Sequence, residues 1–262
     1  RTAVEQITHE SLRQDGAQAL FDAFEETVTP RTKTLLRGVL YSDETSPMRH
    51  LINAGEVQVG LTFAGQAQDY IQDLERLYQV PESRVVIDAG CAALLDEFNE
   101  SANLVGLHPL GIDAISWIVD PSRRPNNDYL ASSAVSQPLI FLTQMAQFTA
   151  LSRIGLESDR IKEWCKATTG HSQGIMAAVV ASEGLKGKAL AKRSATITRY
   201  MLWQGIEMQV AFGPALAEGH AMAAISGLDL EVVESHLEGT NVCVSLHNSF
   251  RRLVISGHPE EI

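Results

Sequence analysis

The sequence Gly-His-Ser-Gln-Gly at residues 170–174 constrains the fold of this chain more than any other feature. A serine between two such glycines is typical of a nucleophile elbow, a sharp turn that lifts the serine hydroxyl above the end of a strand. Glycine permits the tight backbone angles that such a turn needs. Residues 164–169 are compatible with the entering strand, and residues 175–181 are apolar, small and compatible with the following helix. The pattern predicts a nucleophile at Ser172 whose developing oxyanion is stabilised by free N–H groups at the start of that helix.

Composition narrows the classes of protein to which the chain can belong. With 262 residues, 45% of them hydrophobic, the chain is long enough for one large or two small domains with a real core. Its net charge of −11 disfavours nonspecific binding to nucleic acid or to an anionic membrane surface. The apolar runs are far shorter than the ~20 residues that span a bilayer. Three widely spaced cysteines with no metal-binding pattern predict free thiols, no metal site and a reducing, cytoplasmic location.

The distribution of turn residues and apolar periods predicts three segments. Residues 1–54 form an N-terminal helical and loop segment with a helix at 17–26 and a loop at 42–47. Residues 55–218 form the α/β core, in which we expect a strand at 57–63 and helices at 70–78, 92–98, 137–151 and 188–203, the third beginning near Pro138. Residues 219–262 form a smaller unit with strands at 221–225, 242–246 and 252–256, a helix at 230–237 and a helix start at Pro259. This order is the opening of a ferredoxin-like unit.

Four separated segments together resemble one family, the acyl-carrier-protein acyltransferases. They are Thr-Phe-Ala-Gly-Gln at residues 62–66, Ser-Gln-Pro-Leu-Ile-Phe-Leu-Thr-Gln at 136–144, the elbow, and the strand pair at 244–257. Gln173 after the serine, and His-Pro-Leu-Gly at 108–111, are similar to the branch at the start of fungal β-type and actinobacterial multienzyme fatty acid synthases. The resemblance runs from about residue 57 to the end of the chain.

The resemblance implies an α/β-hydrolase-like core with a parallel sheet, and a ferredoxin-like subdomain that is incomplete at the C-terminus. It implies that Ser172 takes an acyl group, the acetyl starter, from coenzyme A and passes it to the phosphopantetheine of an acyl carrier protein. The backbone N–H groups of Gln66 and Gln173 would form the oxyanion hole. The other implied partners are further domains of a large synthase, and no tightly bound cofactor is implied.

Two features depart from the family pattern or leave it open. The family's general base is a histidine after the small subdomain, so we expect it beyond Ile262 and expect this chain alone to be inactive. His247 is the alternative within the chain, although it matches no catalytic position. Malonyl-selecting relatives have an arginine where this chain has Ile197 or Leu202, which favours acetyl, and we expect the nearby Arg199 to face away.

Further alternatives stay open from sequence. With Asn248, the same two apolar residues, Ile197 and Leu202, are the candidates for lining the acyl pocket. The chain is alternatively a malonyl or palmitoyl transferase of the same family. Outside the family, it is alternatively a serine hydrolase (an esterase or thioesterase) or a scaffold fragment of a multienzyme complex with no activity.

Overall fold

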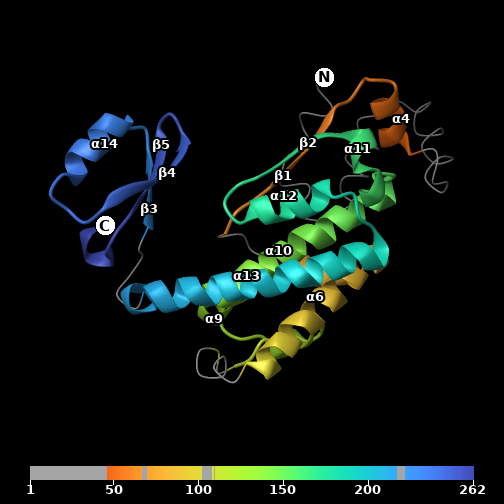
Figure 1. The fold of residues 1–262 in the computed structure, drawn as a ribbon, viewed down its shortest axis with the longest axis horizontal. Coiled ribbons are helices and arrows are strands. Elements are labelled where there is room, and N and C mark those ends of the chain that lie inside the picture. Colours follow the sequence, from red (N-terminus) through yellow and green to blue (C-terminus); the bar gives the residue numbers. More distant parts are fainter. Residues whose placement is uncertain (1–45, 67–69, 102–107, 109, 217–221) are drawn as a thin grey trace. The chain divides into compact units, whose positions relative to one another are not determined.

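The structure is a computed structural model that describes residues 46–66, 70–101, 108, 110–216 and 222–262. The chain divides into two compact units, residues 1–205 and 206–262 (Figure 1). The helix expected at residues 17–26 lies outside the described residues, as does most of the loop expected at 42–47. The segment boundaries that we expect at residues 54 and 218 stay predictions.

A pair of parallel strands lies at the centre of the first unit. Strand β1 (Val59–Phe63) pairs with β2 (Cys165–Gly170), and Phe63 lies opposite Gly170 where both strands end. Helix α12 (Gly174–Ser182) follows β2 after a short turn and packs on both strands (Figure 1). The parallel sheet and the strand–turn–helix order confirm the α/β fold class predicted from the sequence.

Helices cover this pair and supply most of the core. The long connection between β1 and β2 holds the central helix α10 (Ser133–Ala150), which packs against α6 (Pro81–Glu100), α5 (Ile71–Tyr78) and α12. Phe141, Leu142, Met145 and Phe148 of α10 are all buried, as the sequence stripe predicted. No helix among the described residues is long and apolar enough to cross a membrane. The remaining helical segments are α4 (Pro47–Asn53), α8 (Ala114–Val119), η1 (Pro121–Arg123), α9 (Asn127–Ala131), η2 (Leu151–Ile154), η3 (Ser158–Arg160), α11 (Ile161–Trp164) and α13 (Gly187–Leu216).

Several helix bounds differ from those expected. Helix α10 begins at Ser133, so Pro138 lies inside the helix rather than at its start. Helix α6 extends well beyond 92–98, and α13 continues past Trp203 for thirteen residues, to Leu216. Gly205 lies inside α13 and provides a close contact: a Cβ there would lie 2.3 Å from the Ser133 carbonyl oxygen. The glycine lets α13 pack directly against the backbone at the start of α10.

Helix α4 is fixed to the rest of the first unit by polar contacts. Ser46 caps the helix by accepting a hydrogen bond from the Arg49 N–H, and its hydroxyl donates to the Ile154 carbonyl. Arg49 is largely buried and donates to the Glu163 carboxylate of α11 at 2.7 Å. Hydrogen bonds from Arg160 and Arg49 lower the pKa of Glu163. These contacts fix residues 46–53 to η2 and α11, the segments that follow α10 in the chain.

The second unit contains a three-stranded antiparallel sheet. Strands β3 (Met222–Ser226), β4 (Cys243–Ser249) and β5 (Arg252–Ser256) pair in the order β3-β5-β4, with α14 (Leu230–Leu237) between β3 and β4. The segment ends in η4 (Pro259–Glu261). The order of strands and helix matches the ferredoxin-like opening predicted from the sequence. The buried core of this unit is formed by Val233, Val242, Leu253 and Ile255.

Candidate active site

The turn after β2 places Ser172 in a strained backbone conformation at the surface. The His171 N–H donates to the Phe63 carbonyl at 2.9 Å, so the turn begins as a continuation of the β1–β2 pair. Ser172 has φ 51°, and among the described residues it is the non-glycine residue with positive φ. Its side chain is exposed. A left-handed serine between a strand and a helix is the geometry of a nucleophile elbow.

The glycines of the motif are required by close backbone crossings. A Cβ at Gly170 would lie 2.2 Å from the Gly174 carbonyl carbon. A Cβ at Gly174 would lie 2.3 Å from the Phe63 carbonyl oxygen and 2.5 Å from that of Ala64. Any larger residue would therefore overlap backbone atoms, which cannot rotate away as a flexible side chain can. The sequence spacing reflects this local crossing of β1, β2 and α12.

The loop after β1 lies directly against the elbow. A Cβ at Gly65 would lie 3.2 Å from the Ser172 Cβ and 2.9 Å from the His171 Nδ1. The next residue, Gln66, donates through its side-chain amide to the Ser136 hydroxyl at 3.3 Å. The loop that carries Gln66 therefore lies against the turn that carries Ser172.

Gln173 stands at the start of α12. It precedes Gly174, the first helical residue, so its N–H has no carbonyl one turn earlier in the helix to bond. Its side chain is buried, and neither atom of its amide has a hydrogen-bond partner in the described part of the chain. Gln66 and Gln173 therefore flank Ser172 from two different loops. Their role as oxyanion donors stays a prediction.

Sequence reasoning missed one contact of this site. Gln144 of α10 is buried and donates through Nε2 to the Ala64 carbonyl at 2.6 Å, so it holds the loop that carries Gln66. A partial signal was present in the sequence, because Gln144 is an amide next to the apolar stripe of a helix that the sequence predicts to be buried. A polar residue at such a position needs a buried partner.

The acyl-pocket candidates on α13 differ in exposure. Ile197 is half-buried, whereas Leu202 has no exposed surface, so a ligand can touch Ile197 without moving the helix. Arg199 is directed to α6, where its guanidinium lies 3.5 Å from Glu97 and 3.8 Å from Asp96 and donates to the Ala93 carbonyl. These contacts support the expectation that Arg199 faces away from Ile197. The pocket roles themselves remain untested.

The remaining candidates lie in the second unit. Asn248 and His247 are both exposed on β4. The structure brings Ser172, Gln66 and Gln173 together within the first unit, and the assignments of Asn248 to the acyl pocket and of His247 as a base stay predictions. No group of three or more His, Cys, Asp or Glu side chains suited to a metal ion occurs among the residues that the structure describes.

Burial changes the pKa of three other groups in the first unit. It lowers the pKa of His108, whose ring contacts the edge of Tyr129, and His108 is therefore neutral at physiological pH. It raises the pKa of Tyr129 to about 12. It also raises the pKa of the Cys91 thiol, with a further contribution from the negative charges of Asp88 and Asp113. Since burial raises the pKa of both Tyr129 and Cys91, neither has the depressed pKa of an activated nucleophile.

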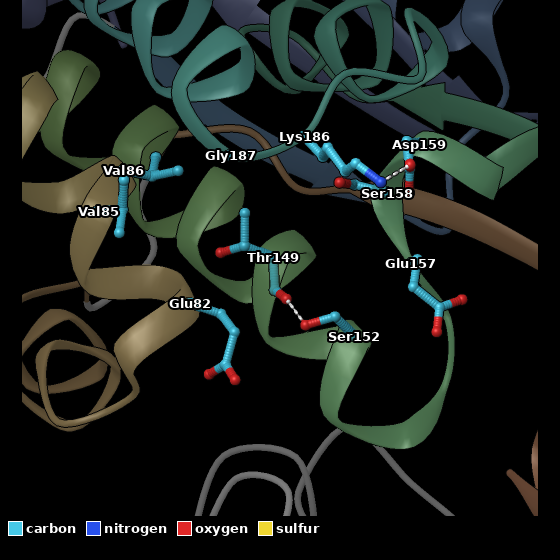
Figure 2. Close-up of a pocket in the computed structure, with 10 residues that line it drawn as sticks. All are labelled: Glu82, Val85, Val86, Thr149, Ser152, Glu157, Ser158, Asp159, Lys186 and Gly187. Carbon is cyan, nitrogen blue, oxygen red and sulfur yellow. Dashed lines mark hydrogen bonds and ion pairs between the residues drawn. The ribbon is translucent and has the colours of Figure 1, made fainter. Parts of the chain in front are cut away.

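A cavity of about 240 Å³ lies away from the elbow (Figure 2). It is lined by Val85 and Val86 of α6, Thr149 at the end of α10, and Lys186, which pairs with Asp159. Thr149 is thirteen residues along α10 from Ser136, which contacts Gln66, and this corresponds to about 20 Å. The cavity is therefore a separate feature and not the space above Ser172.

The family model described as "Starter unit:ACP transacylase in aflatoxin biosynthesis" matches residues 61–260. The fatty acid synthase subunit beta of Schizosaccharomyces pombe is 30% identical over 79% of this chain and 11% of that protein. The corresponding subunit of Saccharomyces cerevisiae is 24% identical over 90% of this chain and 13% of that protein. The chain thus spans about a tenth of the length of these relatives. 

Solved structures share the fold. The acyl-carrier-protein-S-malonyltransferase of Bartonella henselae superposes with a TM-score of 0.54 at 24% identity, over 77% of this chain and 55% of that one. An acyltransferase domain from the second module of the salinomycin polyketide synthase gives a TM-score of 0.52 at 19% identity, over 94% of this chain and 56% of that one. At such identities the likeness extends to the fold alone.

Proposed function

The chain belongs to the starter unit:ACP transacylase family, and from this we propose that it carries the nucleophile of an acyl transfer from coenzyme A to an acyl carrier protein. The observation that carries the proposal is the exposed Ser172 at φ 51°, flanked by the start of α12 and by the loop of Gln66. A hydroxyl so placed can be reached by a thioester. The backbone N–H groups on either side are suited to the negative charge that develops on its carbonyl oxygen.

The transfer proceeds in two substitutions at the acyl carbon. The Ser172 oxygen attacks the thioester carbonyl, the carbon–sulfur bond breaks, coenzyme A leaves as the thiol with the serine proton, and an ester remains. The phosphopantetheine thiol then attacks the ester, and the serine oxygen recovers a proton as it leaves. A hydroxyl at its ordinary pKa needs a general base for the first step. We propose a histidine beyond Ile262 for that role.

The finer parts of the function are also proposals. The acyl group is the acetyl starter, because Ile197 and Leu202 offer no positive charge to a malonyl carboxylate and Arg199 is bound to α6. The partners are an acyl carrier protein and other domains of a large synthase for fatty acids, in line with the relatives named as fatty acid synthase subunits. We propose a cytoplasmic location and no tightly bound cofactor.

Replacing the nucleophile tests the function. The full-length protein is exposed to acetyl-CoA and its intact mass is measured. We expect an acetyl adduct in the wild type, none in Ser172→Ala, and an undiminished adduct in the matched Ser182→Ala, because Ser182 is an exposed serine at the far end of α12, the helix that follows Ser172. An adduct that persists in Ser172→Ala would exclude Ser172. Rapid loss of the acetyl group to water without a carrier protein would favour the hydrolase alternative.

Adding a positive charge next to the proposed acyl pocket tests whether the enzyme prefers acetyl over malonyl. Ile197→Arg places a guanidinium on the half-buried face of α13, where it can form a charge-assisted pair with a malonyl carboxylate. We expect the ratio of malonyl to acetyl transfer to rise roughly 10-fold or more, since such a bond contributes about 1.5–3 kcal/mol. The control Thr196→Arg adds the same charge at an exposed neighbouring position. Equal ratios in both variants and the wild type, measured by competition kinetics, would remove the basis for acetyl.

A further inference from the structure

Helix α10 holds the loop after β1 at two points. The Gln144 Nε2 donates to the Ala64 carbonyl at 2.6 Å, and two turns earlier the Ser136 hydroxyl accepts from the Gln66 side chain at 3.3 Å. Both α10 side chains are almost fully buried. Since Gln66 carries one of the two proposed oxyanion donors, this arrangement matters for the proposed function, on which the following inference rests.

The two hydrogen bonds with α10 are the main polar contacts that the structure describes for residues 64–66. β1 ends at Phe63, and the next two residues belong to no helix or strand. Gly65 separates the Ala64 carbonyl from the Gln66 N–H, and a glycine allows both of its backbone angles to rotate widely. Holding the Ala64 carbonyl on one side of Gly65 and the Gln66 side chain on the other side therefore limits the directions in which the Gln66 N–H can point. The carbonyl is enclosed on its other side by Gly174, where a Cβ would lie 2.5 Å away.

Core stability does not explain a glutamine at position 144. Its Oε1 is buried with no hydrogen-bond partner in the described part of the chain, so half of the amide is unsatisfied. An apolar residue of the same shape would avoid that desolvation cost, and would at the same time leave the Ala64 carbonyl without this donor. The amide cannot be reversed to satisfy the oxygen, because the Ala64 carbonyl only accepts. What the residue provides is the single hydrogen bond to the loop.

We propose that Gln144 is a positioning residue of the acyl transfer, which orients the Gln66 N–H toward the developing oxyanion through the Ala64 carbonyl. Gln144 itself touches neither substrate nor Ser172. Ser136 supports the same loop through the Gln66 side chain. Since acyl loading and acyl release both pass through an oxyanion on the same carbon, Gln144 acts on both steps.

The test is Gln144→Met in the full-length protein, a change that keeps the volume and removes the donor. We expect the rate constants for acetylation of Ser172 and for release of the acetyl group to fall together, roughly 10- to 100-fold, as for a catalytic group misplaced by about 1 Å. We expect the KM for acetyl-CoA to stay at the wild-type value, and the melting temperature to fall by no more than the loss of one buried hydrogen bond explains. The matched control is Gln147→Met, the same change at an exposed position of α10, which should leave both rates unchanged.

The outcomes are distinguishable. Normal rates in Gln144→Met, or a rate loss no larger than its unfolded fraction, would overturn the positioning role while leaving the proposed function intact. A wild type that forms no acetyl-serine would overturn the proposed function and the positioning role with it. If Gln144→Met does not fold, Ser136→Ala removes the second tether, and unchanged acetylation in that variant would overturn the inference.

Discussion

At the scale of single residues, the elbow depends on two glycines that no other residue can replace. Gly174→Ala should destabilise the protein by about 3 kcal/mol or more, because its Cβ would meet the backbone oxygens of Phe63 and Ala64 at 2.3 and 2.5 Å. The control is Gly60→Ala on β1, where a Cβ would meet only the Ala167 oxygen at 3.7 Å. Denaturant unfolding measures both. Equal free energies of unfolding in the two variants would contradict the close crossing.

The same residues show what a sequence can and cannot reveal about a site. The elbow was predictable because the contacts that demand Gly170 and Gly174 lie within a few residues of Ser172 or on the paired strand. The contact from Gln144 to Ala64 was not, since it joins positions 80 residues apart. Nothing near Gln144 in the chain indicates which carbonyl it meets. Likewise, Ile197 and Leu202 could be proposed from resemblance, but their different exposure follows only from the packing of α13.

At the scale of elements, α6 and α10 pack closely against each other in the first unit. A Cβ at Gly90 of α6 would lie 2.4 Å from the Leu142 Cδ1 of α10. Gly90→Ala should therefore cost about 1–3 kcal/mol by overpacking. Leu142→Ala alone should cost about 2–5 kcal/mol by leaving a cavity.

The double variant should be more stable than the sum of these losses implies, because the new methyl group enters the space that Leu142 leaves. We expect a coupling of about 1 kcal/mol or more, within the range for residues in contact. Equilibrium unfolding of the four proteins in the cycle measures it. Additive losses would mean that the two helices do not meet at this point.

Element bounds were predictable to the extent that local signals decide them. Helix α14 and strand β5 have the expected bounds, since α14 has apolar residues at helical spacing and β5 alternates between buried and less buried residues. Helix α13 continues past the expected end at Trp203 and through Gly205, although glycine disfavours a helix interior, because Gly205 packs closely against Ser133. Pro138 resembles a helix start, but the surrounding buried residues continue α10 on both sides of it. In both cases packing outweighs the local preference.

At the scale of the whole molecule, two compact units have separate cores. The second unit is small and rests on four buried apolar residues, one of which is Leu253. Leu253→Ala should cost this unit about 2–5 kcal/mol. Hydrogen exchange should then accelerate in β3, β4 and β5 while the amides of α6 and α10 keep their protection. The same acceleration in both units would show that they unfold as one.

The backbone at Ser172 is one that glycine adopts more readily than any residue bearing a side chain. A chain selected only to stay folded would carry glycine there and gain from the exchange. A serine at this position lowers the free energy of unfolding relative to glycine. Its presence therefore indicates that the hydroxyl is kept for function and not for stability.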